Sequence, residues 1–543
     1  MWKVANKIIQ VIESGQLSLK GVWITFLSLI TIRVLIENWL GNFQRFQGQA
    51  VFFEWSHVFL SLGLTFLLFF FLLFYVLKIS WKKLLNILLW GFLIIWTPPL
   101  TDYWVSHHFL GGQRIWSYYE LSAPTQLKND FLGFFPRDYS QGTTYGVCLE
   151  IALAIIFLTF YAALKKGWKK AVLIGVGSYI IFFILGTLPS WPAILVLGWP
   201  SHFLQVTEVK IAQFFLSPAR IFAYPIKDLL SALNIKMSLW LGVTDFFLIA
   251  FLLYKIQEKR FWAWLKNGRW PQIIYHQGLF LLGVTLALIF THPVWWWDFF
   301  NFFALLLAMQ AVLLAWWASV AVNDIFDKKI DEVSNQQRPH VQNIFSQTDL
   351  VSLAFFFFFF SLFFGALLGW KIMALLLAYQ ALAWLYSAHP LRLKKIPLLA
   401  GFISALASLL ILITGYILVS PHQSLAGLPS SLIVLLLTAY TLSLPVKDFK
   451  DIEGDKKEGI KTLPVILGEQ WARITVGAGV FISFLASVPV LHETRLTFPA
   501  FLSGSLAFWI INNQKINPRW LPGWLLAIIM VYGLFIVKIV YLP

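Results

Sequence analysis

Two clusters of acidic residues are the part of this sequence best suited to chemistry. The chain has only 25 Asp and Glu residues in 543, and nine of them lie in two short segments. The nine are Asp324, Asp327, Asp331 and Glu332, then Asp448, Asp451, Glu453, Asp455 and Glu458. In each segment three aspartates are spaced i, i+3, i+7, which on a helix brings their carboxylates within about 60° of one another. We therefore expect each segment to present one stripe of three carboxylates.

A stripe of three carboxylates at a helix end is unfavourable without a positive partner. Like charges three and four residues apart repel on a helix, and acidic residues at the C-terminal end oppose the helix dipole. Mg²⁺ prefers hard oxygen ligands and commonly binds one or two carboxylates together with substrate phosphates. Two facing stripes would therefore suit metal ions that bridge a diphosphate. The alternative, ordinary solvated loop charges, does not explain why the spacing occurs twice.

The rest of the chain is predominantly apolar. Of the 543 residues, 59% are hydrophobic and 12% are charged, whereas a soluble domain carries about 25% charged residues. The chain therefore lacks the polar surface of a soluble enzyme or of a nucleic-acid-binding protein. A membrane-spanning helix needs about 20 mostly apolar residues, and on this scale the sequence divides into about fifteen predicted spans. We expect an all-α polytopic membrane protein in which each acidic segment follows the end of a span.

The basic residues predict the orientation of these spans. Lys and Arg, 41 in all, are concentrated in alternate connections, and such connections favour the cytoplasmic side. We predict that the N-terminus and both acidic segments are cytoplasmic and that the protein lies in the cytoplasmic (inner) membrane. The first span is interpreted as retained, because no signal-peptide cleavage pattern is evident. Residues 189–237, interrupted by prolines, predict a re-entrant or interfacial stretch.

The most charged connection, residues 255–271, predicts a boundary between two modules. We assign residues 1–270, with about six spans, to an N-terminal polytopic membrane module of unknown function. Residues 271–543, with nine spans, carry both acidic segments.

Three motifs in residues 271–543 resemble those of the UbiA superfamily of intramembrane prenyltransferases. NDIFDKKID, which begins at Asn323 and precedes Arg338-Pro339, matches NDxxDxxxD with a later RP. DFKDIEGD, which begins at Asp448, matches DxxDxxGD, and YSAHPLRLK, which begins at Tyr386, is similar to the loop YSxxPLxLK of several branches. The family has nine transmembrane helices. The resemblance therefore implies a nine-helix UbiA-type bundle, preceded by an additional membrane module of about six helices that lies outside the resemblance.

The resemblance also implies that an isoprenyl diphosphate binds between the two aspartate motifs through Mg²⁺, and it implies which residues bind it. The implied metal ligands are Asn323, Asp324, Asp327 and Asp331 for one ion and Asp448, Asp451 and Asp455 for a second. The implied catalytic residues are Asp324, Asp327, Asp448 and Asp451, and the implied diphosphate-binding residues are Asn323, Arg338, Tyr386, Arg392 and Lys394. Lys447, Lys450 and Lys461 we interpret as basic residues of cytoplasmic connections.

The implied reaction is the transfer of an isoprenyl chain from a polyprenyl diphosphate to an acceptor. Departure of the diphosphate leaves an allylic cation, so metal ions and basic groups stabilise the leaving group while the helix bundle excludes water. In most family members the acceptor is an aromatic ring, which favours a quinone-type precursor here; other branches use a tetrapyrrole carboxylate or a glycerol-phosphate hydroxyl. The expected partners are the donor, a hydrophobic or amphiphilic acceptor and membrane lipid, and no nucleic acid.

Two alternatives remain open. A membrane terpene cyclase would ionise the same diphosphate without an external acceptor. A lipid or ion transporter would use its acidic residues as a pathway, and it predicts acids at mid-membrane depth in several helices. The observed acids instead lie in two stripes near one membrane surface, which favours the transferase. For residues 1–270 we expect a module beside the transferase that recruits or receives a lipid.

Overall fold

The computed structural model describes residues 2–16, 18–40, 48–112, 119–133, 143–226, 228–293, 298–457 and 459–542. Glu458 of the second acidic segment lies outside these residues. The chain divides into two compact units, the first formed by Met1–Ile221, Pro225–Ile256 and Asp298–Phe303. The second unit is formed by Phe222–Tyr224, Gln257–Trp297 and Ala304–Pro543.

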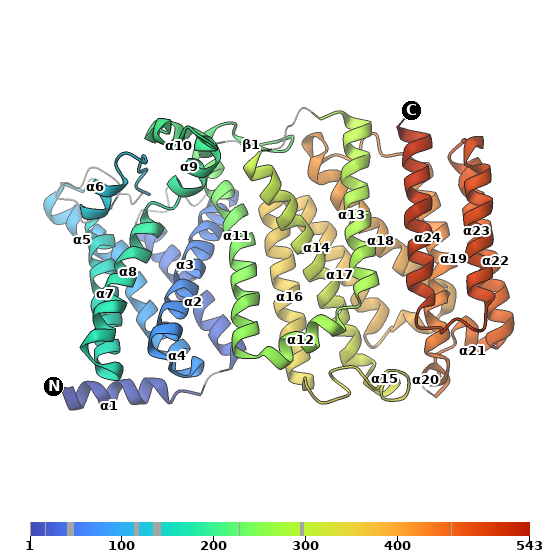
Figure 1. Ribbon diagram of the computed structural model, residues 1–543, viewed down its shortest axis with the longest axis horizontal. Coiled ribbons are helices and arrows are strands. Elements are labelled where there is room, and N and C mark those ends of the chain that lie inside the picture. Colours follow the sequence, from blue (N-terminus) through green and yellow to red (C-terminus); the bar gives the residue numbers. More distant parts are fainter. Residues whose placement is uncertain are drawn as a thin grey trace. The chain divides into compact units, whose positions relative to one another are not determined.

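In the described ranges, the regular structure is helical apart from one short hairpin of two strands, β1 (Arg220–Ile221) and β2 (Tyr224–Pro225) (Figure 1). Among the described residues, 14 helices are long and apolar enough to cross a membrane. Six of these precede Gln257 and eight follow Arg269. The remaining predicted span folds as helix α17 (Trp370–Ser387), which is not among the 14. The prediction of an all-α polytopic membrane protein is confirmed.

The first unit has six candidate membrane spans among its described residues. Five of them precede the proline-rich stretch that begins at residue 189, and the sixth is α11 (Leu229–Ile256). Its helices are α1 (Trp2–Glu13), α2 (Leu19–Leu40), α3 (Gly48–Leu77), α4 (Trp81–Gly91), η1 (Phe92–Trp96), α5 (Thr97–Phe109), α6 (Leu127–Leu132), α7 (Tyr145–Lys166), α8 (Trp168–Gly186), α9 (Ser190–Gly198), η2 (Phe203–Gln205), α10 (Glu208–Leu216) and α11 (Leu229–Ile256). Helices α9 and α10 have nine residues each, too few for a bilayer core that requires about 20. The predicted interruption at 189–237 is therefore present, as short helices and the hairpin.

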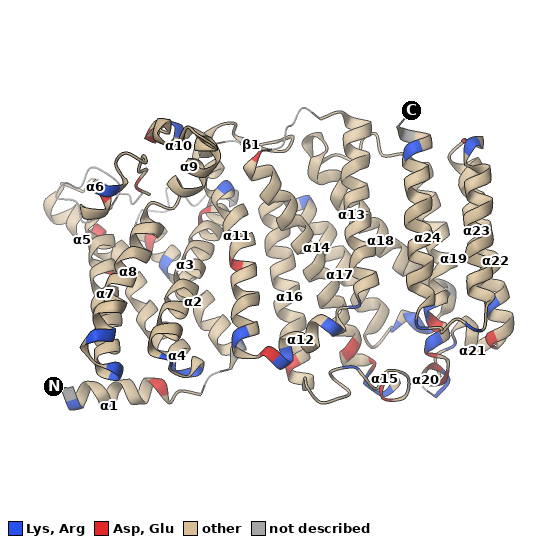
Figure 2. Cartoon of the chain, in the orientation of Figure 1, with Lys and Arg blue, Asp and Glu red and all other residues tan. Residues whose placement is uncertain are grey.

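The second unit carries its charged residues mainly at one end of its long helices, around α12, α15 and α20 (Figure 2). We call this the motif end. The helices are α12 (Glu258–Asn267), α13 (Trp270–Thr291), α14 (Phe299–Phe326), α15 (Lys328–Ser334), α16 (Gln347–Leu368), α17, η3 (Leu393–Lys395), α18 (Pro397–Val419), η4 (Pro421–Gln423), α19 (Ser430–Ser443), η5 (Leu444–Lys450), α20 (Ile452–Lys457), α21 (Leu463–Leu467), α22 (Glu469–Val490), η6 (Thr494–Leu496), α23 (Thr497–Asn512), α24 (Leu521–Ile536) and η7 (Val537–Tyr541).

Helices α13 and α18 meet backbone to backbone. A Cβ atom at Gly283 would lie 2.0 Å from the carbonyl oxygen of Leu412, and one at Gly415 would lie 1.9 Å from that of Phe280. No side chain fits at either position, so both glycines are required by this close approach. The contact fixes α13 and α18 as one wall of the interior described below.

The charged connection predicted at 255–271 is mostly helix α12, which packs on the second unit. Trp264 is buried, with its ring centroid 5.3 Å from that of Phe357 and 5.9 Å from that of Phe345. On the same side, Arg260 pairs with Asp349 at 3.3 Å. Within this connection, Glu258–Asn267 are therefore helical and packed as part of the second unit. The assignment of 1–270 and 271–543 to separate modules stays a prediction.

Candidate functional site

The first aspartate motif lies on a broken helix rather than on the continuous helix that was predicted. Asp324 is in the last turn of α14, Asp331 is in α15, and Asp327 lies between them with φ −103° and ψ 9°. The backbone N–H groups of Asp327 and Asp331 still donate to the carbonyls four residues earlier, each at 2.9 Å. The carboxylates keep a one-turn spacing, but the chain changes direction at Asp327. The prediction of one straight stripe is therefore wrong, because the three aspartates lie along a bend between two helices.

The second motif bends in the same way. Asp448 belongs to the 3₁₀ segment η5, Asp455 belongs to α20, and Asp451 lies between them with φ −112° and ψ 8°. The N–H of Asp455 donates to the carbonyl of Asp451 at 2.9 Å. Both helices are interrupted because Asp327 and Asp451, near φ −100° and ψ 0°, lie outside the α-helical region. The chain nevertheless continues to turn at these residues.

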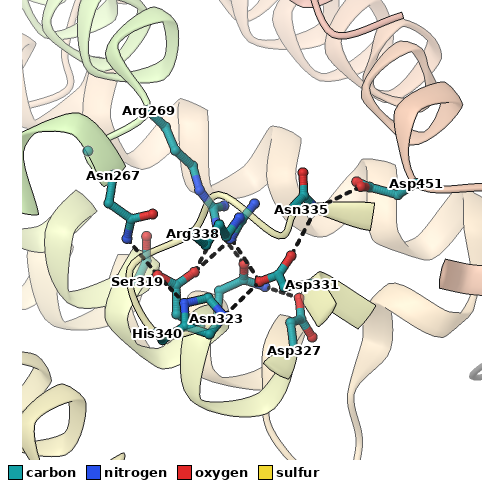
Figure 3. Close-up of polar contacts among 12 residues, drawn as sticks. Asn267, Arg269, Ser319, Asn323, Asp327, Asp331, Asn335, Arg338, His340 and Asp451 are labelled. Atoms are coloured by element: carbon teal, nitrogen blue, oxygen red, sulfur yellow. Dashed lines mark hydrogen bonds and ion pairs between the residues drawn. The ribbon is translucent and has the colours of Figure 1, made fainter. Parts of the chain in front are cut away.

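A single amide joins the two motifs. The Nδ2 atom of Asn335 donates to Oδ1 of Asp331 at 2.9 Å and to Oδ1 of Asp451 at 3.0 Å (Figure 3). Asn335 follows α15, so the bend at Asp327 is what carries it towards α20. The structure thus brings the two predicted motifs side by side at the motif end.

Asp324 is enclosed by donors rather than exposed to an open site. Its side chain is 0% accessible, and it receives Nη1 of Arg338 at 2.8 Å, Nη2 of Arg269 at 3.0 Å and Nδ2 of Asn267 at 2.7 Å. Arg338 also contacts Asp331, with Nη1 3.1 Å from Oδ2. In this arrangement Asp324 orients the two guanidinium groups, and it does not line the cavity described below.

His340 is a residue of this site that the sequence motifs did not indicate. Its Nε2 atom lies 3.1 Å from Oδ2 of Asp331 and its Nδ1 atom 3.6 Å from Oδ2 of Asp324. Burial lowers the pKa of His340, but the hydrogen bonds and charges of the two carboxylates outweigh it and raise that pKa to about 9. His340 is therefore cationic at neutral pH in this arrangement and reinforces the positive charge around the first motif.

Asp327 is balanced by the loop that follows α17. It accepts from Nη2 of Arg392 at 2.9 Å and from Nζ of Lys394. Burial raises the pKa of Asp327, but Lys394 and Arg392 outweigh it and hold the pKa below its usual value. Lys394 lines the cavity, whereas Arg392 is buried behind it and also donates to the carbonyl of Phe326 at 3.3 Å. The two predicted diphosphate-binding residues of this loop therefore occupy different positions.

Tyr386 and Lys447 form a pair on the cavity wall. The Nζ atom of Lys447 donates to the Tyr386 hydroxyl and lies 4.8 Å from the centroid of its ring. Lys450 also lines the cavity, with Nζ 3.5 Å from Oδ2 of Asp451. The interpretation of Lys447 and Lys450 as ordinary loop residues does not describe these positions, whereas Lys461 is exposed and does not line the cavity.

The cavity has a volume of about 1020 Å³ and extends from the motif end into the helix bundle. Among the residues that line it near the motifs are Asn323, Asp327, Asp331, Arg338, Asp448, Asp451 and Asp455. Burial raises the pKa of Asp455 to about 7, and the neighbouring carboxylates of Asp448 and Asp451 add to this shift. The carboxylates of the second motif are hard oxygen donors that repel one another, and such a set fits a divalent cation such as Mg²⁺.

The deeper part of the cavity carries aromatic and imidazole groups. The Nδ1 atom of His276 lies 2.7 Å from the carbonyl of Gln272 and so carries the proton, which leaves Nε2 to accept from the Tyr379 hydroxyl at 3.1 Å. Tyr379 precedes Tyr386 by seven residues, as Tyr440 precedes Lys447. A separation of two turns places each pair on one helix face, which is a signal the sequence contains.

Two further site residues come from the last residue of α12 and from the connection that follows it. The Nη2 atom of Arg269 donates to Oδ1 of Asn323 at 2.6 Å as well as to Asp324, and Asn267 donates to Asp324 (Figure 3). No pattern in the sequence distinguishes Asn267 or Arg269 from other residues of a charged connection. Their contribution depends on the packing of α12.

Residues 278–519 match the model of the UbiA prenyltransferase family. A bacteriochlorophyll synthase 33 kDa chain of Rhodobacter capsulatus is 34% identical over 161 residues, which are 28% of this chain and 52% of that protein. A digeranylgeranylglyceryl phosphate synthase of Methanobrevibacter smithii is 27% identical over 195 residues, which are 35% of this chain and 66% of that protein. The chain thus spans between half and two thirds of the length of these relatives. The resemblance seen in the three motifs is confirmed.

Among solved structures, a UbiA homolog from Archaeoglobus fulgidus bound to GPP and Mg²⁺ is similar to this chain. The two share 18% sequence identity, with a TM-score of 0.39, over 51% of this chain and 99% of that one.

Proposed function

We propose that the protein is a Mg²⁺-dependent prenyltransferase, on the premise that residues 278–519 match the UbiA prenyltransferase family. It would transfer an isoprenyl chain from a polyprenyl diphosphate to an acceptor at the cytoplasmic side of the membrane. The observation that carries the proposal is the pair of aspartate motifs, joined through Asn335, at the mouth of one cavity that continues into the bundle.

The donor would bind with its diphosphate between the motifs. Asp327 and Asp331 would hold one Mg²⁺ with the side-chain oxygen of Asn323, and Asp448, Asp451 and Asp455 would hold a second. All six residues line the cavity. Asp324 was predicted as a further ligand, but its contacts with Arg269 and Arg338 favour a positioning role. Arg392, predicted to contact the diphosphate, would likewise act by fixing Asp327.

The chain's own residues would then assist departure of the diphosphate. Bound Mg²⁺ supplies a Lewis acid that stabilises the negative charge on the leaving group. Arg338, Lys394 and Lys447 line the cavity as fixed positive groups that favour the same charge without reorganisation. As the C1–oxygen bond breaks, its electron pair leaves with the diphosphate. The acceptor then forms a bond to C1 and releases a proton.

The body of the cavity would hold the isoprenyl chain away from water. Leu525, Leu526 and Ile529 of α24 form an apolar part of its wall. Exclusion of water protects an allylic cation from hydrolysis. The opposite part of the wall carries the aromatic side chains of Tyr275, Tyr379 and Tyr440, which fit a planar acceptor or the double bonds of the chain.

The acceptor is one of three classes. We predict an aromatic quinone-type precursor from the family resemblance. The names of two relatives, a bacteriochlorophyll synthase and a digeranylgeranylglyceryl phosphate synthase, add a tetrapyrrole and a glycerol-phosphate lipid. Residues 1–270 would form a separate membrane module that recruits or receives a lipid.

The test is turnover by the purified full-length protein in lipid nanodiscs. Labelled polyprenyl diphosphates of several chain lengths are supplied with Mg²⁺ and a panel of the three acceptor classes, and products are identified by mass spectrometry. We expect Mg²⁺-dependent release of diphosphate and a prenylated acceptor. A cyclised hydrocarbon formed equally without acceptor would show the terpene cyclase instead, and no diphosphate release with any donor would overturn both.

A further inference from the structure

We propose that one face of α12, formed by Lys259, Trp262 and Lys266, binds an anionic group of the prenyl acceptor. The group is a carboxylate or a phosphate on an amphiphilic molecule. This inference rests on the proposed function and adds to it the chemistry by which the acceptor is recognised. Helix α12 ends at Asn267, before the residues 278–519 that match the family.

The three side chains share one face of α12 and line the mouth of the cavity. Their spacing of i, i+3, i+7 places them within one stripe of a helix. All three line the cavity near the aspartate motifs. Lys259 and Lys266 are exposed, and Trp262 is 48% exposed. The stripe therefore presents two ammonium groups with an indole ring between them to whatever enters the cavity.

The other side of α12 is fixed to the second unit, which holds this stripe in place. Trp264 is buried against Phe345 and Phe357, and Arg260 pairs with Asp349 at 3.3 Å. In Figure 1, α12 runs across the ends of the long helices of this unit rather than parallel to them. A helix held by its buried face presents the opposite face reproducibly, as recognition requires.

The end of α12 is tied to the first aspartate motif. Asn267 and Arg269 donate to Asp324 at 2.7 and 3.0 Å, and the indole Nε1 of Trp316 donates to the carbonyl of Gly268 at 3.0 Å. Lys266 is therefore adjacent in sequence to a residue that contacts the donor site. An anion bound at the stripe would lie beside the donor, where an acceptor must be to reach C1.

The two lysines of the stripe form no ion pair with the described aspartates of the motifs. Arg338, Lys394 and Lys450 of the cavity wall pair with carboxylates of the motifs. Neither Lys259 nor Lys266 has an ion-pair partner within the part of the chain that the structure describes. The donor diphosphate is assigned to the space between the motifs, so a second anion in this cavity belongs to the acceptor. The ring of Trp262 offers an apolar surface to the body of that molecule.

The experiment compares the double variant Lys259→Gln/Lys266→Gln with wild type in nanodiscs of neutral phosphatidylcholine, and the comparison is repeated with anionic lipid added. The matched control, Lys461→Gln/Lys515→Gln, removes the same charge from two exposed lysines that do not line the cavity. The probes are 4-hydroxybenzoic acid with its neutral amide, and a glyceryl phosphate lipid with its dephosphorylated alcohol. The measurements are kcat, the separate KM values of donor and acceptor, and equilibrium binding of the labelled anionic acceptor without donor.

We expect the KM and Kd of the anionic acceptor to rise about tenfold in the double variant, because two ion pairs with the acceptor are lost. The neutral acceptor, the donor KM and kcat are expected to stay within twofold, as are all values of the control. Lys259→Arg/Lys266→Arg is expected to restore acceptor binding, because the charge is retained.

Four outcomes would overturn the inference. They are an unchanged acceptor KM, a rise in the donor KM, an equal effect on charged and neutral acceptors, and an effect seen only when anionic lipid is added, which would make the stripe a lipid headgroup site. If wild type releases diphosphate and prenylates an acceptor, only the inference fails in these cases. If wild type releases no diphosphate with any donor, the proposed function fails and the inference fails with it.

Discussion

The two aspartate motifs share a spacing and a bend, but they differ in how their charge is balanced. In the first motif, Asp324 receives two arginines at 2.8 and 3.0 Å, and Asp327 receives Arg392 at 2.9 Å. In the second motif, Asp451 is the only aspartate with an ion pair among the described residues. Its Oδ2 atom lies 3.5 Å from Nζ of Lys450. The same sequence pattern has therefore produced one compensated and one uncompensated site.

Because of this difference, we expect ionisation of the second motif to depend on a bound metal ion more than ionisation of the first motif does. Lys394 and Arg392 outweigh burial and hold the pKa of Asp327 below its usual value, so this carboxylate is ionised without a metal. Burial and two neighbouring carboxylates raise the pKa of Asp455 to about 7, so the second motif resists full ionisation until a cation binds. The predictions below test this contrast, from the largest effect to the smallest.

The largest effect is expected from loss of an uncompensated carboxylate. Asp448→Ala should lower kcat by about 10³-fold, because it removes a proposed ligand of the metal ion that stabilises the leaving group. In other enzymes, removal of a group that stabilises developing charge has an effect of this size. The measurement is steady-state turnover at saturating Mg²⁺ and donor. Glu453→Gln, an exposed acid of the same segment, is the control and should retain activity. Activity of Asp448→Ala within threefold of wild type would remove the second motif from the proposed site.

Loss of the enclosed carboxylate is expected to act first on stability. Asp324→Asn leaves Arg269, Arg338 and His340 without their shared counter-charge, and breaking a buried pair costs about 3–5 kcal/mol. Chemical unfolding should show this loss equally with EDTA and with Mg²⁺. A double-mutant cycle with Arg269→Gln should recover part of it. If Asp324→Asn were as stable as wild type with EDTA and weaker only with Mg²⁺, Asp324 would be a metal ligand, as the sequence motif implied.

The pH dependence of stability without metal should report the second motif. Because the pKa of Asp455 is raised to about 7 from an ordinary value near 4, the folded state holds a proton that the unfolded state releases between these values. Its contribution therefore lowers stability as pH rises through that window.

In EDTA, Asp455→Asn should flatten the stability profile between about pH 4 and pH 7 by about 1 kcal/mol or more. The measurement is the unfolding midpoint at each pH. In wild type, saturating Mg²⁺ should remove the same slope, because the bound cation favours the ionised carboxylates. A slope that Asp455→Asn and Mg²⁺ both leave unchanged would contradict the assignment of this repulsion to the second motif.

The smallest effect is expected in the first unit, which contains a buried acid whose charge is balanced by its neighbours. Glu13 is 7% exposed and accepts from Lys165 at 2.8 Å and from the Tyr161 hydroxyl at 2.9 Å, with Lys83 3.6 Å away. These contacts join α1, α4 and α7. Glu13 thus has the burial of the motif aspartates but a purely structural set of partners.

Glu13→Gln should lower the free energy of unfolding by about 1 kcal/mol, because its lysine partners are partly exposed. Turnover and both KM values should remain those of wild type. Glu208→Gln, which changes an exposed acid of the same unit, should change neither. A loss of turnover in Glu13→Gln without a loss of stability would show that the first unit takes part in the reaction.

The sequence predicted the parts of the site that depend on local spacing. The aspartates, Arg338, Tyr386, Arg392 and Lys394 recur at fixed separations, and the structure gathers them at one end of the second unit. It did not predict which of them face the cavity. Whether Asp324 or Asp327 lines the cavity depends on the bend after Phe326 and on the donors that surround each carboxylate, and most of those donors come from other segments.

Residues without a motif were missed for the same reason. His340, Asn335 and Arg269 are single polar residues in connections, and their types and spacing are ordinary. Each became part of the site only when α12, α15 and α20 packed together. Lys447 was interpreted as a loop residue because basic loops are common in membrane proteins, but its contact with Tyr386 places it on the cavity wall.

The sequence by itself determined the class of protein, the spans and the two clusters of carboxylates, because hydropathy and helical spacing act over a few residues. Only the tertiary structure decided which carboxylates are neutralised, where the cavity runs and that residues 258–267 of the charged connection form a helix that lines it. These depend on contacts between residues far apart in the chain, such as Asn335 and Asp451, which are 116 residues apart. The strength of a charge inside a membrane protein depends on such neighbours more than on its own position in the sequence.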